Sequence, residues 1–248
     1  MELLTHGLGV CPPEWGVRQE EPAGYVRVYY ILSGRVRYRD AERETVLKPG
    51  HLYLFPVSCP YQITHDPNRP IECLWFHIDF FPYDADRLVE LDPSAEPTLA
   101  HILNALLAEV EREKKRSPLL LALTEALYHT VLRIGAFRQT EAELQCILEY
   151  MRSHFADREL TVQRLAERFG YTAAHLIRRF QAGVRNTPHR YLATLRLSHG
   201  AKCLLEGATV SAAANESGYG DVKSFSRAFI KLYGVPPSRY RHYYRPMA

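Results

Sequence analysis

The sequence lacks the features of a membrane-embedded, secreted or disulfide-stabilised protein. No apolar run approaches the roughly 18 residues that span a bilayer, and the densest run, 119–123, is far shorter. The first residues, Met-Glu-Leu-Leu-Thr-His, contain neither the basic stretch nor the apolar segment of a signal peptide. The five cysteines are scattered and odd in number, and no two form a Cys-x-x-Cys pair. These absences predict a reduced cytoplasmic protein and argue against a disulfide framework or a zinc knuckle.

Charge is distributed unevenly along the chain. The formal net charge is +3, yet residues 140–248 carry a net charge of +7 and residues 1–139 a net charge of −4. A basic half joined to an acidic half is typical of a polyanion-binding domain linked to a domain with another task. At 248 residues the chain is long enough for two domains, each with its own core.

The first 82 residues have the pattern of a small β domain. The run 26–32 is β-branched and aromatic and ends at a Ser-Gly turn, and shorter runs of the same kind follow at 35–38, 52–55 and 61–64. The longest run, 71–81, has one apolar face and one mixed face. Short strands separated by Gly and Pro at this spacing predict a β-barrel or sandwich.

Polar and aromatic side chains of these strands could hold a small molecule inside such a barrel. An indole ring can stack on a sugar, and Arg, His and Asp side chains can bind hydroxyls or a carboxylate. Strand alternation does not decide which face looks inward, so these side chains alternatively fill the core. The candidate ligand-binding residues are Arg18, Arg27, Tyr29, Tyr53, Trp75, His77 and Asp79.

Between the β domain and the basic half, the pattern changes to helix. The acidic, proline-containing segment 84–97 predicts a loop, and leucines at helical spacing then predict helices over 98–116 and 119–137. Ser117-Pro118 separates them, with proline at a favoured helix start. This antiparallel pair either packs within its own chain or forms the contact of a homodimer. The polar segment 138–143 is predicted to be a linker.

The basic half contains a duplicated unit. Thr161, Gly170-Tyr171, Arg178, Phe180 and Pro188 of the first copy return in the second with an offset of 48 residues up to the Gly-Tyr pair and 49 after it. Each copy has a capping residue, a short apolar helix, a glycine suited to positive φ and a second capped helix. This layout predicts two helix-turn-helix units, joined by one long helix over 187–205.

The second helix of each copy is predicted to read DNA. Leu176 and Phe180, and in the second copy Phe225 and Phe229, lie four residues apart and should face inward, which leaves the other side of each helix exposed. An exposed arginine can bond guanine O6 and N7 in the major groove, and small apolar side chains can touch thymine methyl groups. An all-helical packing or protein-binding domain is the alternative. The candidate DNA-binding residues are Ala174, Ile177, Arg178 and Gln181 of the first copy and Val222, Lys223, Ser224, Ser226 and Arg227 of the second.

The two copies are predicted to be unequal. The second offers Lys223, Ser226 and Arg227, whereas the first offers mainly Arg178 beside Ala174 and Ile177. If both enter successive major grooves on one face of DNA, they must lie about 34 Å apart. A domain of this size is barely that wide, so we expect bent DNA or partial insertion of one unit.

These motifs resemble the AraC/XylS family of bacterial transcription regulators. The resemblance covers residues 142–245 and is strongest over Gly218-Tyr219 and the segment 225–241. The strands resemble, more loosely, the cupin-type ligand-binding domain of that family, through Tyr30-Ile-Leu-Ser-Gly34 and Trp75-Phe-His77. The resemblance implies an α+β protein of two domains: a cupin-like sensor and dimerisation domain over 1–137, with its barrel over 1–82, and an all-α DNA-binding domain over 144–245.

Three functions follow from these patterns. The first is a sequence-specific regulator, with no enzymatic activity, that binds double-stranded DNA and a small effector, for which the resemblance implies a sugar. As an activator it would also contact RNA polymerase. The second is a metal-dependent cupin enzyme with a helical appendage, but His51, His65 and His77 follow no ligand spacing and the strand region 25–30 has no histidine. The third is a regulator whose barrel serves only dimerisation. No cofactor and no metal are predicted for the first.

Overall fold

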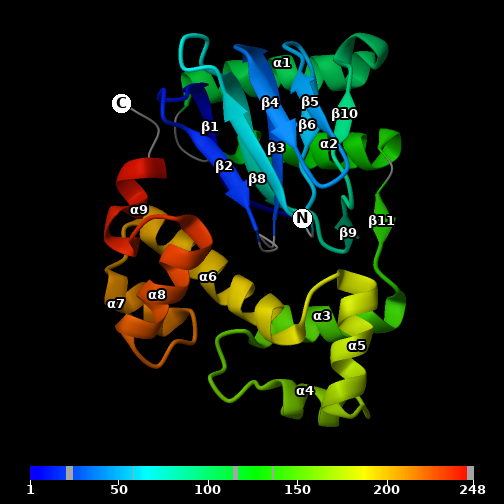
Figure 1. Cartoon of the computed structure of the whole chain (residues 1–248), viewed down its shortest axis with the longest axis vertical. Helices are drawn as coiled ribbons and strands as arrows, with labels where there is room; N and C mark the ends of the chain where they lie inside the picture. The colour runs from blue at the N-terminus through cyan, green and yellow to red at the C-terminus, as the bar shows by residue number, and fades with distance from the viewer. Residues whose placement is uncertain (21–24, 58, 114–116, 136, 245–248) are drawn as a thin grey trace. The chain divides into compact units, whose positions relative to one another are not determined.

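The computed structural model describes residues 1–20, 25–57, 59–113, 117–135 and 137–244. The described chain up to Gln139 forms one compact unit, and the chain from Thr140 onward forms a second (Figure 1). The first unit is mainly β and the second is entirely helical, which confirms the predicted α+β class. Within the described ranges, none of the helices combines the length and apolar content needed to cross a bilayer.

The N-terminal unit is built on two antiparallel sheets. One has five strands in the order β1-β8-β3-β6-β10, and the other has four in the order β2-β7-β4-β5. The strands of the first sheet are β1 (Glu2–Val10), β3 (Val26–Ser33), β6 (Leu52–Leu54), β8 (Glu72–Asp79) and β10 (Val89–Leu91). Those of the second are β2 (Gly16–Gln19), β4 (Val36–Arg39), β5 (Glu44–Leu47) and β7 (Tyr61–His65).

The two faces of β8 pack against different neighbours. Its apolar residues, such as Leu74 and Phe76, belong to a core shared with the helix pair. Cys73 and Trp75 instead join a second core, to which the four-stranded sheet contributes Tyr38 and Tyr61. The mixed face of β8 therefore looks into the space between the sheets. Strand alternation alone left this choice open.

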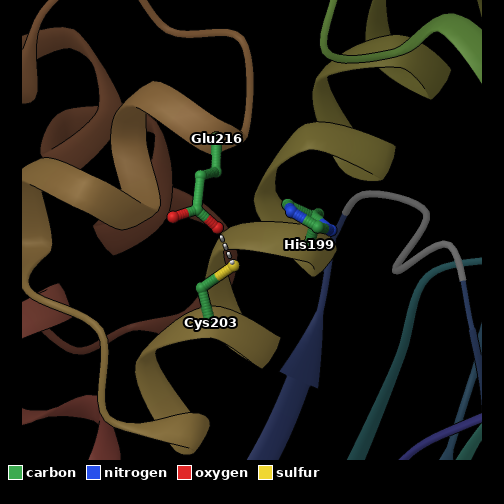
Figure 2. Close-up of side chains that lie close together, drawn as sticks. All are labelled: His199, Cys203 and Glu216. Atoms are coloured by element: carbon green, nitrogen blue, oxygen red, sulfur yellow. Dashed lines mark hydrogen bonds between the residues drawn. The ribbon is translucent and has the colours of Figure 1, made fainter.

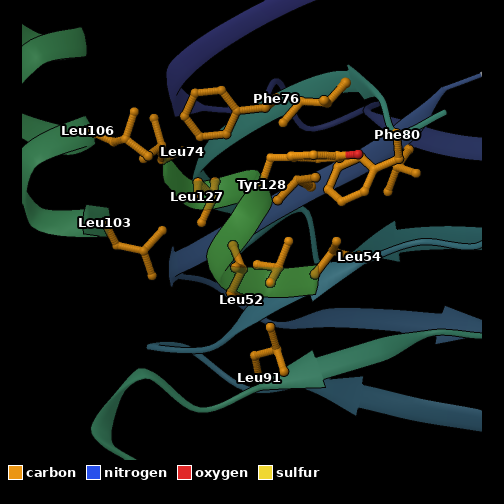
Figure 3. Packing of buried hydrophobic residues seen from close by; sticks show 14 of the residues in the cluster. Leu52, Leu54, Leu74, Phe76, Phe80, Leu91, Leu103, Leu106, Leu127 and Tyr128 are labelled. Atoms are coloured by element: carbon orange, nitrogen blue, oxygen red, sulfur yellow. The ribbon is translucent and has the colours of Figure 1, made fainter. Parts of the chain in front are cut away.

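The helix pair covers the outer face of the five-stranded sheet. Helices α1 (Pro97–Arg112) and α2 (Pro118–Ile134) bring Leu103, Leu106, Leu127 and Tyr128 onto Leu52, Leu54, Leu74, Phe76 and Phe80 (Figure 3). The Ser117 hydroxyl accepts a hydrogen bond from the backbone NH of Leu120 and caps α2, as expected at a Ser-Pro helix start. Both helices are shorter than predicted: α1 ends at Arg112, α2 ends at Ile134, and the predicted end of the first at Arg116 lies outside the described residues.

The segments around the helix pair contain short strands that were not predicted, and the boundary between the two units falls at Gln139, inside the predicted linker. The segment 84–97, expected to be a loop, contains β10, which pairs with β6, and a short 3-10 helix, η1 (Pro93–Ala95). The segment 138–143, expected to be a linker, begins with β11 (Arg138–Gln139), which pairs with β9 (Tyr83–Asp84). Composition pointed to loops because these strands are only two or three residues long and their pairing partners lie far away in sequence.

The C-terminal unit contains the predicted tandem of helical units. Its helices are α3 (Ala142–His154), α4 (Val162–Arg168), α5 (Ala173–Val184), α6 (Pro188–Glu206), α7 (Val210–Glu216), α8 (Val222–Tyr233) and α9 (Pro237–Tyr244). The predicted caps are confirmed, because side-chain oxygens of Thr161, Thr172, Thr209 and Asp221 each accept a hydrogen bond from a backbone NH three residues later. Helix α6 is the predicted connector between the two units.

The glycine between the helices of each unit has the predicted positive φ, which is +72° at Gly170 and +78° at Gly218. Their surroundings differ. A Cβ atom at Gly170 would meet nothing within 4 Å, whereas a Cβ at Gly218 would lie 2.8 Å from the backbone oxygen of Ala156. The second turn therefore needs glycine both for its conformation and for its close approach to the chain after α3.

This difference gives a matched pair of substitutions. Gly170→Ala should lower the free energy of unfolding by about 1 kcal/mol, the cost of a left-handed conformation for a residue with a Cβ. Gly218→Ala should cost about 3 kcal/mol, because the steric conflict with Ala156 adds to that term. Chemical denaturation of the full chain, followed by the helical circular dichroism signal, measures both. Equal losses would mean that the close approach to Ala156 does not matter.

Candidate functional site

Helices α5 and α8 present equivalent outward surfaces. In α5, Leu176 and Phe180 are fully buried, and in α8, Phe225 and Phe229 are fully buried. Because these pairs lie four residues apart on one side of each helix, the opposite side is left to solvent. Helix α5 begins three residues after Gly170 and α8 four residues after Gly218, so the first turn of each follows directly on the turn between the helices.

The first helix-turn-helix unit is anchored to α3 by a charged cluster. The guanidinium of Arg179 lies 2.8 Å from a Glu143 carboxylate oxygen and 3.3 Å from one of Glu141. The Tyr171 hydroxyl donates to the same Glu143 carboxylate. Arg179 is thus engaged in positioning α5. Arg178 points to the other side and is exposed, so the two adjacent arginines have different tasks.

The second unit is held by aromatic packing against α6 and α9. The Phe229 ring meets Tyr240 of α9 edge-on at 5.0 Å between centroids. Gly200 of α6 lies under Phe225, where an added Cβ would come within 2.6 Å of the ring. Through these contacts α8 packs against the connector helix α6, and Arg227 remains exposed.

The structure places the predicted DNA-binding residues at or near the surface. Among the described residues, neither Arg178 nor Arg227 is assigned a carboxylate partner in an ion pair, so both guanidinium groups are available to an external acceptor. The carboxylate of Asp221 remains ionised beside this surface, because the backbone NH of Ser224 stabilises its charge and lowers its pKa. The exposed members of this set are Ala174, Arg178, Gln181, Val222, Lys223 and Arg227. The half-buried members are Ile177, Ser224 and Ser226.

One exposed residue at this surface escaped the sequence analysis. His175 occupies in α5 the position that Ser224 occupies in α8, and its side chain is exposed. Its backbone NH donates to the Thr172 cap, which fixes it in the first turn of the helix. The repeat offset of 49 residues, applied to Ser224, would have identified it.

A second candidate site lies between the sheets of the N-terminal unit, around Arg27. One terminal nitrogen of its guanidinium donates to Gln19 Oε1 at 2.5 Å and to the Tyr61 hydroxyl at 2.8 Å. The other donates to the Tyr25 hydroxyl at 3.2 Å. Among the described residues, these hydrogen bonds join Arg27 to neutral partners and no carboxylate is assigned to it as an ion pair. The residue as a whole is only partly buried, and three hydrogen bonds hold its guanidinium in place.

The mixed face of β8 supplies the neighbours of this cation. His77 lies opposite Arg27 in the strand register, and its ring stacks on Tyr25 at 4.6 Å. Burial, and then the charge of Arg27, lower the pKa of His77 well below its ordinary value, so the ring is neutral at pH 7. Trp75 lies 5.2 Å from His77 and is half-buried. The surroundings of Arg27 therefore combine one permanent cation with aromatic rings.

The other predicted ligand-binding residues have different positions. Tyr29 is buried in the core between the sheets, and Tyr53 is fully buried with its hydroxyl accepting from the Lys48 backbone NH at 2.8 Å. Asp79 is buried and accepts from the Phe81 backbone NH at 2.9 Å. Arg18 does not join them, because its side chain is 76% exposed and pairs with Glu20 at 2.9 Å. The prediction missed Gln19 and Tyr61, whose contact with Arg27 depends on the pairing of β2 with β7.

Comparisons with known proteins agree with both units. The AraC-binding-like domain model matches residues 1–133, and a helix-turn-helix domain model matches residues 165–243. An uncharacterised HTH-type transcriptional regulator of Bacillus subtilis, YobQ, is 24% identical over 222 residues, covering 88% of this chain and 86% of its own. The raffinose operon transcriptional regulatory protein RafR of Pediococcus pentosaceus is 22% identical over 265 residues, covering 96% and 92%.

Solved structures show the same fold over nearly the whole chain. The crystal structure of ToxT from Vibrio cholerae O395 matches with a TM-score of 0.71 at 12% identity, covering 98% of each chain. Because the AraC-binding-like model matches more than half of the sequence and the helical unit has the tandem architecture described above, the family is settled. The chain belongs to the AraC family of DNA-binding transcription regulators and combines a helix-turn-helix domain with an N-terminal ligand-binding domain.

Proposed function

We propose that this regulator reads DNA through the exposed faces of α5 and α8, and that α8 contributes more of the sequence preference. The observation that supports this most directly is the equivalent placement of Arg178 and Arg227. Both are exposed on the side of the helix opposite a fully buried pair, and neither is assigned an ion-pair partner among the described side chains. An arginine so placed can bond guanine bidentately in the major groove.

The residues that flank these arginines differ chemically between the two helices. Lys223 of α8 is exposed and positioned for a base or a phosphate, whereas Ala174 at the equivalent position of α5 can only touch a methyl group. His175 adds one polar group to α5 that Ser224 matches in α8. The connector α6, with its 19 residues, is about 28 Å long. It joins the two units, whose reading helices must lie about one turn of DNA apart to enter successive major grooves.

Arg227→Ala tests the assignment of α8. It should weaken binding to the preferred DNA sequence by about 1–3 kcal/mol and relax the preference at one base pair, because the bidentate contact to guanine is lost. Fluorescence anisotropy on a DNA panel varied one base pair at a time measures both effects. Arg18→Ala is the control, since it removes the same charge from an exposed site on the other unit. An Arg227 variant with unchanged affinity and preference would remove Arg227 from the reading surface.

For the N-terminal domain we propose a small effector anchored by Arg27. The guanidinium is held by three neutral hydrogen-bond acceptors and is assigned no carboxylate among the described residues. A carboxylate on the ligand would supply the missing counter-charge. Trp75, half-buried on the same face of the sheet, offers a ring for stacking.

The relatives indicate two effector classes. Regulators of a raffinose operon and of a lactose operon are named among them, which favours a sugar. A solved ToxT structure is described as bound to an unsaturated fatty acid, which favours a carboxylate. A sugar acid offers a ring on which Trp75 can stack and hydroxyls that the tyrosines can bind. Its carboxylate can pair with Arg27. We therefore propose a hydroxyl-rich carboxylate as the effector.

A thermal-shift panel of neutral sugars, sugar acids and fatty acids tests this effector. A sugar acid at about one hundred times its dissociation constant should stabilise the chain by about 2.7 kcal/mol. Arg27→Gln should remove most of that stabilisation, because the counter-charge is lost, while Arg18→Gln, the same change on an outward-facing residue, should keep it. Stabilisation of the Arg27 variant equal to that of the wild type would exclude Arg27 as the anchor. If no compound of the panel stabilises the chain, a barrel that serves only dimerisation becomes the better account.

We propose further that the chain forms a homodimer through the start of α2. Leu119 and Leu121 are 51% and 43% exposed there, on a helix whose other side is buried against the sheet. They flank the buried Leu120 on the first turn of α2, and a second copy that covered this turn would bury both side chains. Two DNA-binding domains brought together in this way would bind two half-sites.

The double variant Leu119→Glu/Leu121→Glu should be monomeric where the wild type is dimeric, since charges would be placed in the apolar contact. Light scattering at one fixed concentration measures the mass. Val46→Glu is the matched control, because Val46 is 52% exposed on a strand of the four-stranded sheet. A double variant that stays dimeric would move the interface elsewhere.

The remaining partners follow from this assignment. A regulator of this kind acts in the cytoplasm, where its DNA is, and if it activates transcription it contacts RNA polymerase. Binding rather than catalysis is the task we propose for the barrel, in keeping with the family. Effector and DNA communicate only if binding of one changes the affinity for the other, and the same factor must then apply in both directions.

A further inference from the structure

Three potential metal ligands meet between the connector helix and the second helix-turn-helix unit. His199 and Cys203 lie on α6, and Glu216 is the last residue of α7. The imidazole nitrogen, the thiol sulfur and a carboxylate oxygen all lie within 4.8 Å of one another (Figure 2). Neither the DNA-reading surface nor the proposed effector site uses these residues.

The helical geometry explains why they meet. His199 and Cys203 are four residues apart, so their side chains lie one turn apart on the same face of α6. Helix α7 returns along that face, because Ala213 and Ala214 of α7 pack with Ala201 and Leu204 of α6 in one core. This packing brings the end of α7, with Glu216, over the thiol. The Cys203 thiol donates to Glu216 Oε2 at 3.4 Å.

The three groups form a small site with a buried floor and an open rim. Cys203 is 5% exposed, His199 is half-buried and Glu216 is exposed. The His199 ring is tilted against Phe155 at 4.9 Å, which restricts its rotation on one side. A metal ion bound between these groups would replace the thiol proton.

The donor set selects the metal. Nitrogen, sulfur and one carboxylate oxygen suit Zn²⁺, whereas Mg²⁺ and Ca²⁺ prefer oxygen ligands alone. Around a tetrahedral Zn²⁺ the ligand atoms would lie roughly 3.4–3.8 Å apart. Binding would require the present spacing of up to 4.8 Å to close to that range by movement of the exposed Glu216 side chain. Three protein ligands leave a fourth position for water.

We propose that His199, Cys203 and Glu216 bind one Zn²⁺ ion that ties α7 to the connector helix α6. The ion would fasten the first helix of the second helix-turn-helix unit to its scaffold. It would therefore stabilise the helical unit whether or not DNA is bound. The site is independent of the proposed effector and of the residues proposed to read bases.

Titration of the reduced, metal-free full chain with Co²⁺ tests the site, because cobalt bound to a thiolate shows a charge-transfer absorption band. We expect a band that saturates at one equivalent and is displaced by Zn²⁺. Cys203→Ser should abolish it, and Cys146→Ser, which removes an exposed thiol from α3, should leave it unchanged. His199→Asn and Glu216→Gln alter the rim rather than the core, and each should weaken binding at least about tenfold.

Three results would overturn the proposal. They are a wild type without the band, a band that survives in Cys203→Ser, and rim variants that bind Co²⁺ as tightly as the wild type. Circular dichroism shows whether each variant is folded. If Cys203→Ser proves unfolded, the two rim variants alone decide, because their positions are at the surface or half-buried.

Discussion

The burial of one pair of side chains in each reading helix is the constraint on which the DNA-binding surface depends. Leu176 with Phe180, and Phe225 with Phe229, are completely withdrawn from solvent. Because members of a pair lie one helical turn apart, their burial fixes the rotation of α5 and α8 about their axes. Arg178 and Arg227, two residues before the second member of each pair, must then project outward. The same scaffold that stabilises the domain thus presents its charge to DNA.

In the N-terminal domain, one strand serves two environments. The apolar face of β8 packs on the helix pair (Figure 3). Its other face places Trp75 and His77 beside Arg27. The helices therefore cover the apolar face of the sheet, and the mixed face of β8 lies between the two sheets. A guanidinium held by neutral phenols and an amide, next to a neutral imidazole, keeps an uncompensated positive charge there.

Local signals predicted the helical domain closely, and long-range pairing limited the prediction of the β domain. Caps such as Thr161 and Asp221 and the turn glycines are encoded within a few residues, so they could be located before the fold was known. The strand β10, and the approach of Gln19 and Tyr61 to Arg27, depend on partners far along the chain. The two repeats also end differently: Arg185 ends α5 with φ of +52°, where the second repeat uses Gly234.

The central claim is that two unequal helices of one chain contact two successive major grooves. A hydroxyl-radical footprint on DNA selected by the protein from a random pool tests it most directly. We expect, for each bound chain, two protected windows on one face of the duplex, about 10 base pairs apart, with stronger base selection in one. A single protected window per chain, or equal base selection in both, would contradict the account.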